Sequence, residues 1–203
     1  MIGVTKSFLP KRQFFAQYVD QIWESNRITS NGQLSKELAS KMAAYLQVPY
    51  LNLVSSGTLG LQIAIKALDL EGDVITTPFS YVATTSSIVW LSSNPVFVDI
   101  EADSWNIIFY TDTEYNYAYY PVLFPSQDLV VNVKEKLKEM GFHARRYFYP
   151  ALSQLPYVNT TPMPIAEDIA NRILCLPLSH EMNEIEIDKI VMTILSILKY
   201  KTC

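Results

Sequence analysis

Residues 50–100 read YLNLVSSGTLGLQIAIKALDLEGDVITTPFSYVATTSSIVWLSSNPVFVDI, and this stretch decides the fold. Short runs that suit strands alternate in it with longer apolar segments of helical length. The predicted elements are a strand at Tyr50–Val54, a helix at Leu59–Leu68, a strand at Asp73–Thr77, a helix at Tyr81–Leu91 and a strand at Pro95–Ile100. Alternating strands and helices are typical of a parallel sheet with crossover helices, so the expected fold class is α/β.

The flanking sequence adds helices on one side and a second α/β unit on the other. Before the sheet, apolar residues recur at helical spacing over residues 10–25 and Gln33–Leu46. After Asp103 the rhythm changes, and we expect strands of mixed pairing. The predicted elements there are a strand at Tyr117–Phe124, a helix from Ser126 to Gly141, a strand at His143–Tyr149, a helix at Pro164–Arg172, a strand at Ile173–Leu178 and a helix at Asn183–Leu198. We place the boundary between Asp103 and Glu114, which predicts domains of residues 1–110 and 111–203.

Composition narrows the function classes. The 203 residues are 49% apolar and 18% charged with a net charge of −4, which disfavours both disorder and a nucleic-acid binder. Two cysteines, Cys175 and Cys203, form no disulfide framework or zinc cluster by themselves. Because neither a signal peptide nor a membrane-spanning stretch is evident, we expect a soluble cytoplasmic protein with no membrane partner.

A serine-rich turn, Ser55-Ser56-Gly57-Thr58-Leu59-Gly60, joins the first predicted strand to its helix. The first amides of a helix lack intrahelical acceptors, so they and the Thr58 hydroxyl suit a phosphate, which Gly57 lets approach closely. Ser and Thr are equally typical of a helix N-cap, and that interpretation stays open. The turn is neither a P-loop nor a dinucleotide fingerprint, because the Gly-Lys-Ser/Thr and G-x-G-x-x-G patterns are both absent.

The remaining candidates are less specific. Tyr81 lies where the second predicted strand ends, the edge at which open α/β sheets bind ligands, and its ring suits either stacking on a planar ligand or packing on the sheet. His143 and His180 have no catalytic partner nearby in sequence, and no cluster has the spacing of metal ligands. Arg145 and Arg146 suit either an anion or an ion-paired surface.

These stretches, taken in order, make the sequence resemble the DegT/StrS-type sugar aminotransferases, and most of all the members acting on dTDP-linked 3-keto-6-deoxyhexoses. The resemblance runs over most of the chain. The stretches that carry it are Ile28–Gly32, Ser56–Thr58, Thr76–Thr84, Pro95–Ile100, Tyr117–Val122, Arg146–Pro150, Pro164–Glu167 and Leu174–Leu178.

The resemblance implies a fold, a cofactor and substrates. The implied fold is an aspartate-aminotransferase-like (fold type I) large domain with parallel strands, which binds pyridoxal 5′-phosphate, followed by a small α/β domain. The implied site residues are Ser56, Gly57 and Thr58 for the cofactor phosphate, Tyr81 for its ring, and Thr29, Asn31 and Arg146 for the substrate. The implied substrates are a dTDP-keto-sugar and L-glutamate, and the implied role is polysaccharide biosynthesis. The implied assembly is a dimer, with a second copy or with a paralogue.

One part of the family pattern is missing. The resemblance implies a long central segment between the parts that match Ile107 and Glu114, and this segment carries the Schiff-base lysine and the aspartate that pairs with the pyridine nitrogen. We therefore assign no catalytic residue, and we expect a remnant of the large domain whose strands either close into a three-stranded sheet or leave apolar edges exposed. Three readings follow: an inactive relative, a non-catalytic chain that pairs with a full-length paralogue, and an enzyme that finds its lysine elsewhere.

Overall fold

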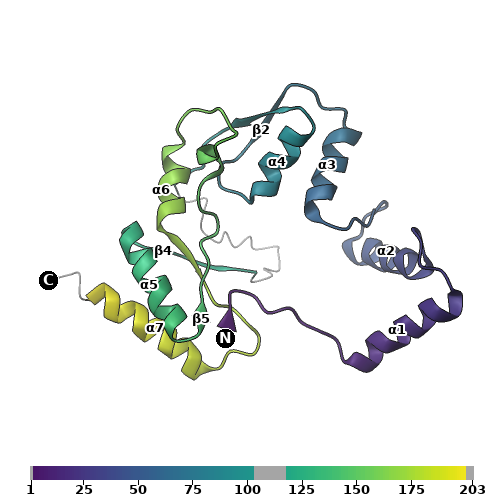
Figure 1. Cartoon of the computed structure of the whole chain (residues 1–203), viewed down its shortest axis with the longest axis horizontal. Helices are drawn as coiled ribbons and strands as arrows, with labels where there is room; N and C mark the ends of the chain where they lie inside the picture. The colour runs from purple at the N-terminus through teal and green to yellow at the C-terminus, as the bar shows by residue number, and fades with distance from the viewer. Residues whose placement is uncertain (1, 103–117, 200–203) are drawn as a thin grey trace. The chain divides into compact units, whose positions relative to one another are not determined.

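The structure is a computed structural model, and it describes residues 2–102 and 118–199. The chain forms two units (Figure 1): a helical unit at Ser7–Gly60 and a main unit made of Met1–Lys6 and Leu61–Cys203. Each unit is described by itself. The predicted boundary between residues 1–110 and 111–203 lies outside the described residues, so it stays a prediction.

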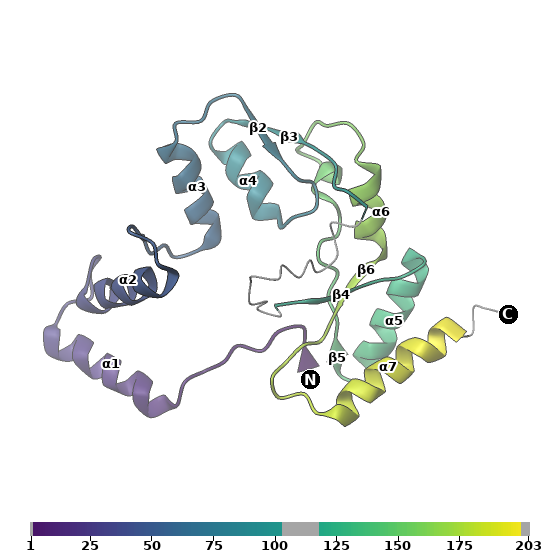
Figure 2. The same ribbon diagram turned by 180° about the vertical axis from the view of Figure 1, so that it is seen from behind.

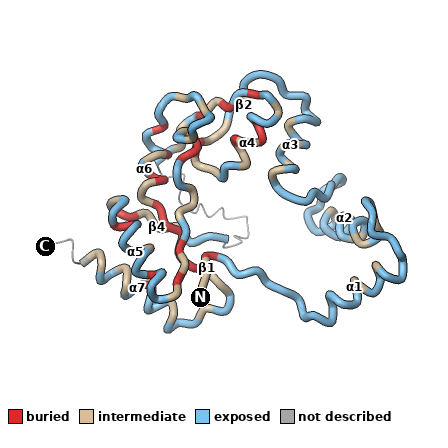
Figure 3. The backbone as a smooth tube through the Cα atoms, viewed as in Figure 1, coloured by how far each residue is buried: buried red, intermediate tan, exposed pale blue. Residues whose placement is uncertain are grey.

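Two amphipathic helices make up most of the helical unit. α1 (Arg12–Ser25) and α2 (Gln33–Leu46) form where the spacing of apolar residues predicts them. Each is followed by a left-handed residue, Asn26 with φ 50° and Gln47 with φ 53°. Neither helix has a buried residue, and most of both is exposed in Figure 3. Their apolar stripes are therefore not covered within this unit.

The predicted strand at Tyr50–Val54 is wrong. The chain has no regular secondary structure there, and it leads directly into α3 (Gly57–Ala67). A strand exists only where its backbone groups pair with a neighbouring strand, and the described residues of the helical unit contain no other strand. The expected three-stranded sheet therefore does not form.

The main unit keeps the other two strands of the predicted sheet. β2 (Asp73–Thr76) and β3 (Asn94–Phe97) pair in parallel, and α4 (Val82–Trp90) packs against both (Figure 2). The register pairs Asp73, Val74, Ile75 and Thr76 with Asn94, Pro95, Val96 and Phe97. Ile75 is 73% exposed and Val98 is 57% exposed. The shortened sheet thus leaves apolar side chains uncovered within its own unit.

The second half of the chain has the mixed strand pairing that its sequence predicts. β4 (Tyr120–Leu123) pairs antiparallel with β6 (Ile173–Leu176), and β1 (Ile2–Gly3) pairs in parallel with β5 (Phe142–His143). The strand predicted at His143–Tyr149 is too long, because beyond β5 only the bridge between Arg145 and Cys175 continues the pairing. β1 was not predicted, since two residues are too few to show a period.

Three helices enclose the main core. α5 (Gln127–Glu139) packs against α7 (Glu184–Lys199), α6 (Pro164–Arg172) and β6, and the Ser126 hydroxyl caps α5 by accepting the Leu129 N–H at 3.4 Å. The buried side chains of this core are Phe124, Leu129, Val130, Val133, Leu137, Phe142, Ala144, Leu174, Leu176 and Ile190. A smaller core joins Phe97, Leu152 of the short 3₁₀ helix η1 (Leu152–Gln154), Met163 and Ala166. The packing of the chain is thus concentrated in the main unit (Figure 3).

Candidate functional site

The turn Ser56-Gly57-Thr58 begins α3, as the sequence predicts. The Ser56 hydroxyl accepts the Leu59 N–H at 3.2 Å, and the Ser56 carbonyl accepts the Gly60 N–H at 3.0 Å. Ser56 is therefore the N-cap of α3, which confirms the structural interpretation of this serine. Its Oγ atom acts as an acceptor in this cap, so the hydroxyl keeps its own O–H as a donor.

Gly57 leaves open space at the first turn of α3. A Cβ atom at this position would have no heavy atom within 4 Å. The amides of the first helical turn have no intrahelical acceptor, and the positive end of the helix dipole lies at the same place. A phosphate can therefore approach the backbone here without a clash inside the helical unit.

Tyr81 lies just before α4, beyond the carboxyl end of β2, and its side chain is 60% exposed. Its ring centroid is 6.4 Å from that of Phe148, and Phe148 in turn contacts Phe79 edge to face at 5.9 Å. Within the main unit Tyr81 is thus the exposed member of an aromatic cluster. Its exposure is compatible with stacking on a planar ligand, and that role of Tyr81 stays a prediction.

The two parts of the predicted cofactor site belong to different units. Ser56, Gly57 and Thr58 lie in the helical unit, whereas Tyr81 lies in the main unit. The structure therefore describes each part separately and does not bring them together.

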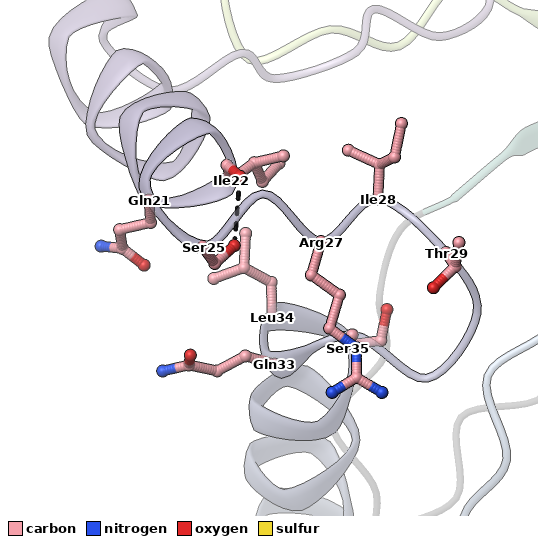
Figure 4. A pocket seen from close by; sticks show the side chains of 10 residues that line it. Gln21, Ile22, Ser25, Arg27, Ile28, Thr29, Gln33, Leu34 and Ser35 are labelled. Carbon is pink, nitrogen blue, oxygen red and sulfur yellow. Dashed lines mark hydrogen bonds between the residues drawn. The ribbon is translucent and has the colours of Figure 1, made fainter.

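One predicted substrate residue lines a cavity. Thr29 contributes to a hollow of about 220 Å³ between the end of α1 and the start of α2 (Figure 4). Asn31 lies in the same turn with a left-handed φ of 62°, but it is not among the lining residues. Arg27 and Gln33 do line the cavity, and the sequence did not single them out. A signal was available for Arg27 only: it is a basic residue directly before the Ile28–Gly32 motif.

The third predicted substrate residue, Arg146, holds the end of α6. Its guanidinium donates from Nη2 to the carbonyls of Ala170 at 3.2 Å and Asn171 at 2.9 Å, and it lies 3.4 Å from the ring centroid of Tyr149. Burial lowers the pKa of Arg146 from its ordinary value, with Tyr149 acting in the opposite direction. Its Nε atom is buried and has no hydrogen-bond partner among the described residues. These contacts give Arg146 a structural role.

Replacing Arg146 with methionine is expected to lower the free energy of unfolding by about 1–3 kcal/mol, because two carbonyls at the end of α6 lose their donor. Arg145→Met is the matched control, since Arg145 is exposed, and its effect should stay below about 1 kcal/mol. The measurement is urea unfolding followed by circular dichroism. Equal losses for the two variants would contradict the structural role.

Five of the described lysines are held in ion pairs. The ion pairs that engage them are Lys6 with Glu181, Lys41 with Glu37, Lys66 with Asp69, Lys136 with Glu139 and Lys138 with Glu135. Each of these lysine side chains is more than half exposed. The hydrogen bond from Glu37 raises the pKa of Lys41, which is the opposite of what a nucleophilic amine needs.

Other reactive groups are equally engaged. Asp168 lies on α6 and pairs with Arg172, whose hydrogen bonds lower the pKa of Asp168. Burial raises the pKa of the Cys175 thiol to about 11, so this thiol stays protonated at neutral pH. Among the described residues no group of His, Cys, Asp or Glu side chains is arranged to hold a metal ion. None of the described helices has the length and apolar character needed to span a bilayer.

Comparison with solved structures defines the class of fold. The chain superposes on the aminotransferase TlmJ from Streptoalloteichus hindustanus with a TM-score of 0.85 at 12% identity, covering 100% of both chains. It superposes on the Helicobacter pylori aminotransferase PseC with a TM-score of 0.80 at 13% identity, covering 98% of this chain and 99% of that one. The fold is the α/β fold of these aminotransferases.

Comparison of sequences then gives the family. The DegT/DnrJ/EryC1/StrS aminotransferase family matches residues 11–111 and 107–195, and the chain belongs to this family. It is 42% identical over 106 residues to the Escherichia coli dTDP-4-amino-4,6-dideoxy-D-glucose transaminase, a match that covers 52% of this chain and 29% of that protein. The chain thus spans less than a third of the length of this curated relative. The resemblance to DegT/StrS-type aminotransferases is confirmed.

Enzymes of this family use pyridoxal 5′-phosphate, and the described residues fit one end of that cofactor. The open space at Gly57 and the first amides of α3 suit the phosphate. A buried amine for the covalent end is absent among the lysines whose side chains the structure describes. The electron-sink chemistry that the cofactor supplies depends on such an amine, so no catalytic step is derived for this chain.

Proposed function

We propose that this chain is a catalytically inactive relative of the pyridoxal-phosphate-dependent nucleotide-sugar aminotransferases. In this proposal the large domain is a remnant without the central segment that carries the Schiff-base lysine and the aspartate for the pyridine nitrogen. The ancestral reaction is amino transfer from L-glutamate to a dTDP-keto-sugar in the cytoplasm, for polysaccharide biosynthesis. The relatives named as dTDP-4-amino-4,6-dideoxy-D-glucose transaminases support this choice of substrate class.

One observation carries the proposal: Gly57 leaves open space at the start of α3, while five of the described lysines are more than half exposed and held in ion pairs. A Schiff-base lysine needs a neutral amine, which proteins obtain by burial or by a neighbouring cation. The family match in two pieces, residues 11–111 and 107–195, supports a missing segment near their junction. Retention of Gly57 supports weak, non-covalent binding of the cofactor phosphate.

The test is reduction with borohydride after pyridoxal 5′-phosphate has been added to the purified chain, followed by peptide mapping. We expect no stoichiometric adduct at any single lysine, and no transamination of a dTDP-keto-sugar with L-glutamate. The E. coli transaminase, treated in parallel, is the positive control. A stoichiometric adduct at one lysine together with amino transfer would contradict inactivity and would favour an enzyme that uses a relocated lysine.

A second function is favoured by the helical unit. Neither α1 nor α2 has a buried residue, and Trp23 and Tyr45 are 76% and 85% exposed. Uncovered apolar faces of this kind mark surfaces that bind another protein. We therefore also propose a non-catalytic partner that dimerises with a full-length paralogue. Co-purification of that paralogue supports this function, and a monomer that ignores the paralogue in analytical ultracentrifugation contradicts it.

A further inference from the structure

A second cavity, of about 580 Å³, lies in the main unit beside the β1–β5 pair. Its lining comes from three segments: the amino-terminal strand continued to Lys6, the β5 segment continued to Arg145, and the turn that leads into α7. None of the residues assigned above to the cofactor or the substrate belongs to it. The cavity is therefore separate from the predicted cofactor and substrate residues.

Two basic residues of the β5 segment line the cavity. Phe142 and Ala144 are 4% and 5% exposed and belong to the main core. His143 and Arg145 lie at the alternate positions, and both line the cavity, as does Ala144 between them. Gly3 lies opposite His143 in the parallel register and also lines the cavity, and the Thr5 backbone lies close to its Cα.

The acidic side chains of the cavity are already engaged. Glu181 pairs with Lys6, whose hydrogen bond lowers the pKa of Glu181. His180 also faces Glu181, with Nε2 and Oε1 3.8 Å apart. Glu186 accepts the Asn183 N–H at 3.0 Å in a reciprocal cap at the start of α7. Glu181 is thus paired with a cation, and one carboxylate oxygen of Glu186 is held by the cap.

Arg145 and the hydroxyl-bearing residues of the lining still have hydrogen-bond donors available for a ligand. Arg145 donates from Nη1 to the Tyr147 hydroxyl at 2.7 Å, which uses one of the five N–H groups of its guanidinium. The hydroxyls of Thr5 and Ser179 lie in the same lining. The guanidinium of Arg145 and the hydroxyls of Thr5 and Ser179 can donate hydrogen bonds into the same cavity. Donors of this kind favour an anionic ligand.

We propose that this cavity binds the phosphate group of a phosphorylated small molecule, with Arg145, His143 and Thr5 as its donors. A phosphate presents three oxygens to donors on several sides, which matches donors from two separate segments better than the two oxygens of a carboxylate. The volume is much larger than a bare phosphate needs and leaves room for an organic part. This site is independent of the proposed loss of aminotransferase activity.

The test is titration of the full chain, observed by isothermal titration calorimetry and by ¹H–¹⁵N NMR. The probes are inorganic phosphate, ribose 5-phosphate and acetate. We expect both phosphates to shift the amide signals of Gly3, His143 and Arg145, with ribose 5-phosphate binding more tightly than inorganic phosphate and acetate causing little change. Absence of binding by either phosphate would overturn the proposal, and so would binding of acetate as tight as that of phosphate.

Variants locate the site. Arg145→Gln is expected to weaken ribose 5-phosphate at least about 10-fold, and Thr5→Val about threefold. Thr5 is exposed in an extended segment, so Thr5→Val tests the site even where Arg145→Gln perturbs the Tyr147 contact. Lys136→Gln on α5, an exposed cation outside the cavity, is the control and should leave binding unchanged. Equal losses in Arg145→Gln and Lys136→Gln would mean nonspecific charge attraction and would overturn the assignment, and so would unchanged binding in Thr5→Val.

Discussion

Replacing Asp99 with alanine should lower the free energy of unfolding by about 2–4 kcal/mol, because the Asp99 carboxylate caps a helix that begins far away in sequence. Its Oδ2 accepts the Ile165 N–H and its Oδ1 the Ala166 N–H, both at 2.9 Å. α6 begins at Pro164, and Met163 at its N-cap position supplies no side-chain cap. Ala166 is completely buried, so water does not replace the lost acceptor.

The comparison with Asp99→Asn separates hydrogen bonding from charge. The amide keeps one acceptor oxygen and loses the negative charge at the helix N-terminus, so we expect about half of the loss. Asp128→Ala is the matched control: Asp128 lies in the first turn of α5 and is exposed, and its loss should be about 0.3–1 kcal/mol. The measurements are urea unfolding and hydrogen exchange of the Ile165 and Ala166 amides.

Two results would contradict this role of Asp99. One is a loss no larger than that of Asp128→Ala. The other is unchanged protection of the Ile165 and Ala166 amides in Asp99→Ala. In both cases the capping bonds would contribute little to stability, and the shared Pro95–Ile100 motif would need another explanation.

Local patterns were enough to predict most of the helices. α2, α5 and α6 form where apolar spacing, a capping serine and an N-terminal proline place them. These signals act within a few residues of each other, so a single sequence contains them in full. The prediction of an α/β fold held for the same reason, since alternation of strands and helices is also a local property.

The pairing of strands could not be predicted in the same way, because it depends on partner strands that are distant in sequence. Tyr50–Val54 has the composition of a strand but no neighbour to pair with in its unit. β1 is only two residues long and forms because β5 lies beside it. Ile75 shows the complementary case: it lies in β2, which is paired with β3, yet its side chain is not covered by the described residues of the main unit.

The roles of the candidate site residues also depend on partners that the local sequence does not reveal. The sequence around Ser56 suits both a cap and a phosphate cradle; the hydrogen bond from Leu59 shows the cap, and the cradle stays a prediction. Arg146 was expected at a substrate, which stays a prediction, and the structure adds a role as donor to the carbonyls of Ala170 and Asn171, 24 and 25 residues further along the chain. Motif residues shared with a family of enzymes can thus have structural roles that the sequence alone does not separate from functional ones.

Leu174→Ala should lower the free energy of unfolding by about 2–5 kcal/mol, the usual cost of a large cavity in a packed core. Leu174 is completely buried at the centre of β6, between the partner strand β4 and the bridge to Arg145. Its neighbours in the core include Val130 and Val133, which are also completely buried. The measurement is urea unfolding followed by circular dichroism, with the m-value checked for a change in cooperativity.

Ile75→Ala is the informative control, because Ile75 is also an apolar strand residue but is 73% exposed. Removing its side chain from an uncovered position should change stability by less than about 0.5 kcal/mol. A loss at Ile75 that approached the loss at Leu174 would mean that another surface covers this face in solution. If that loss grew with protein concentration, the covering surface would belong to a second copy, since only association makes stability depend on concentration.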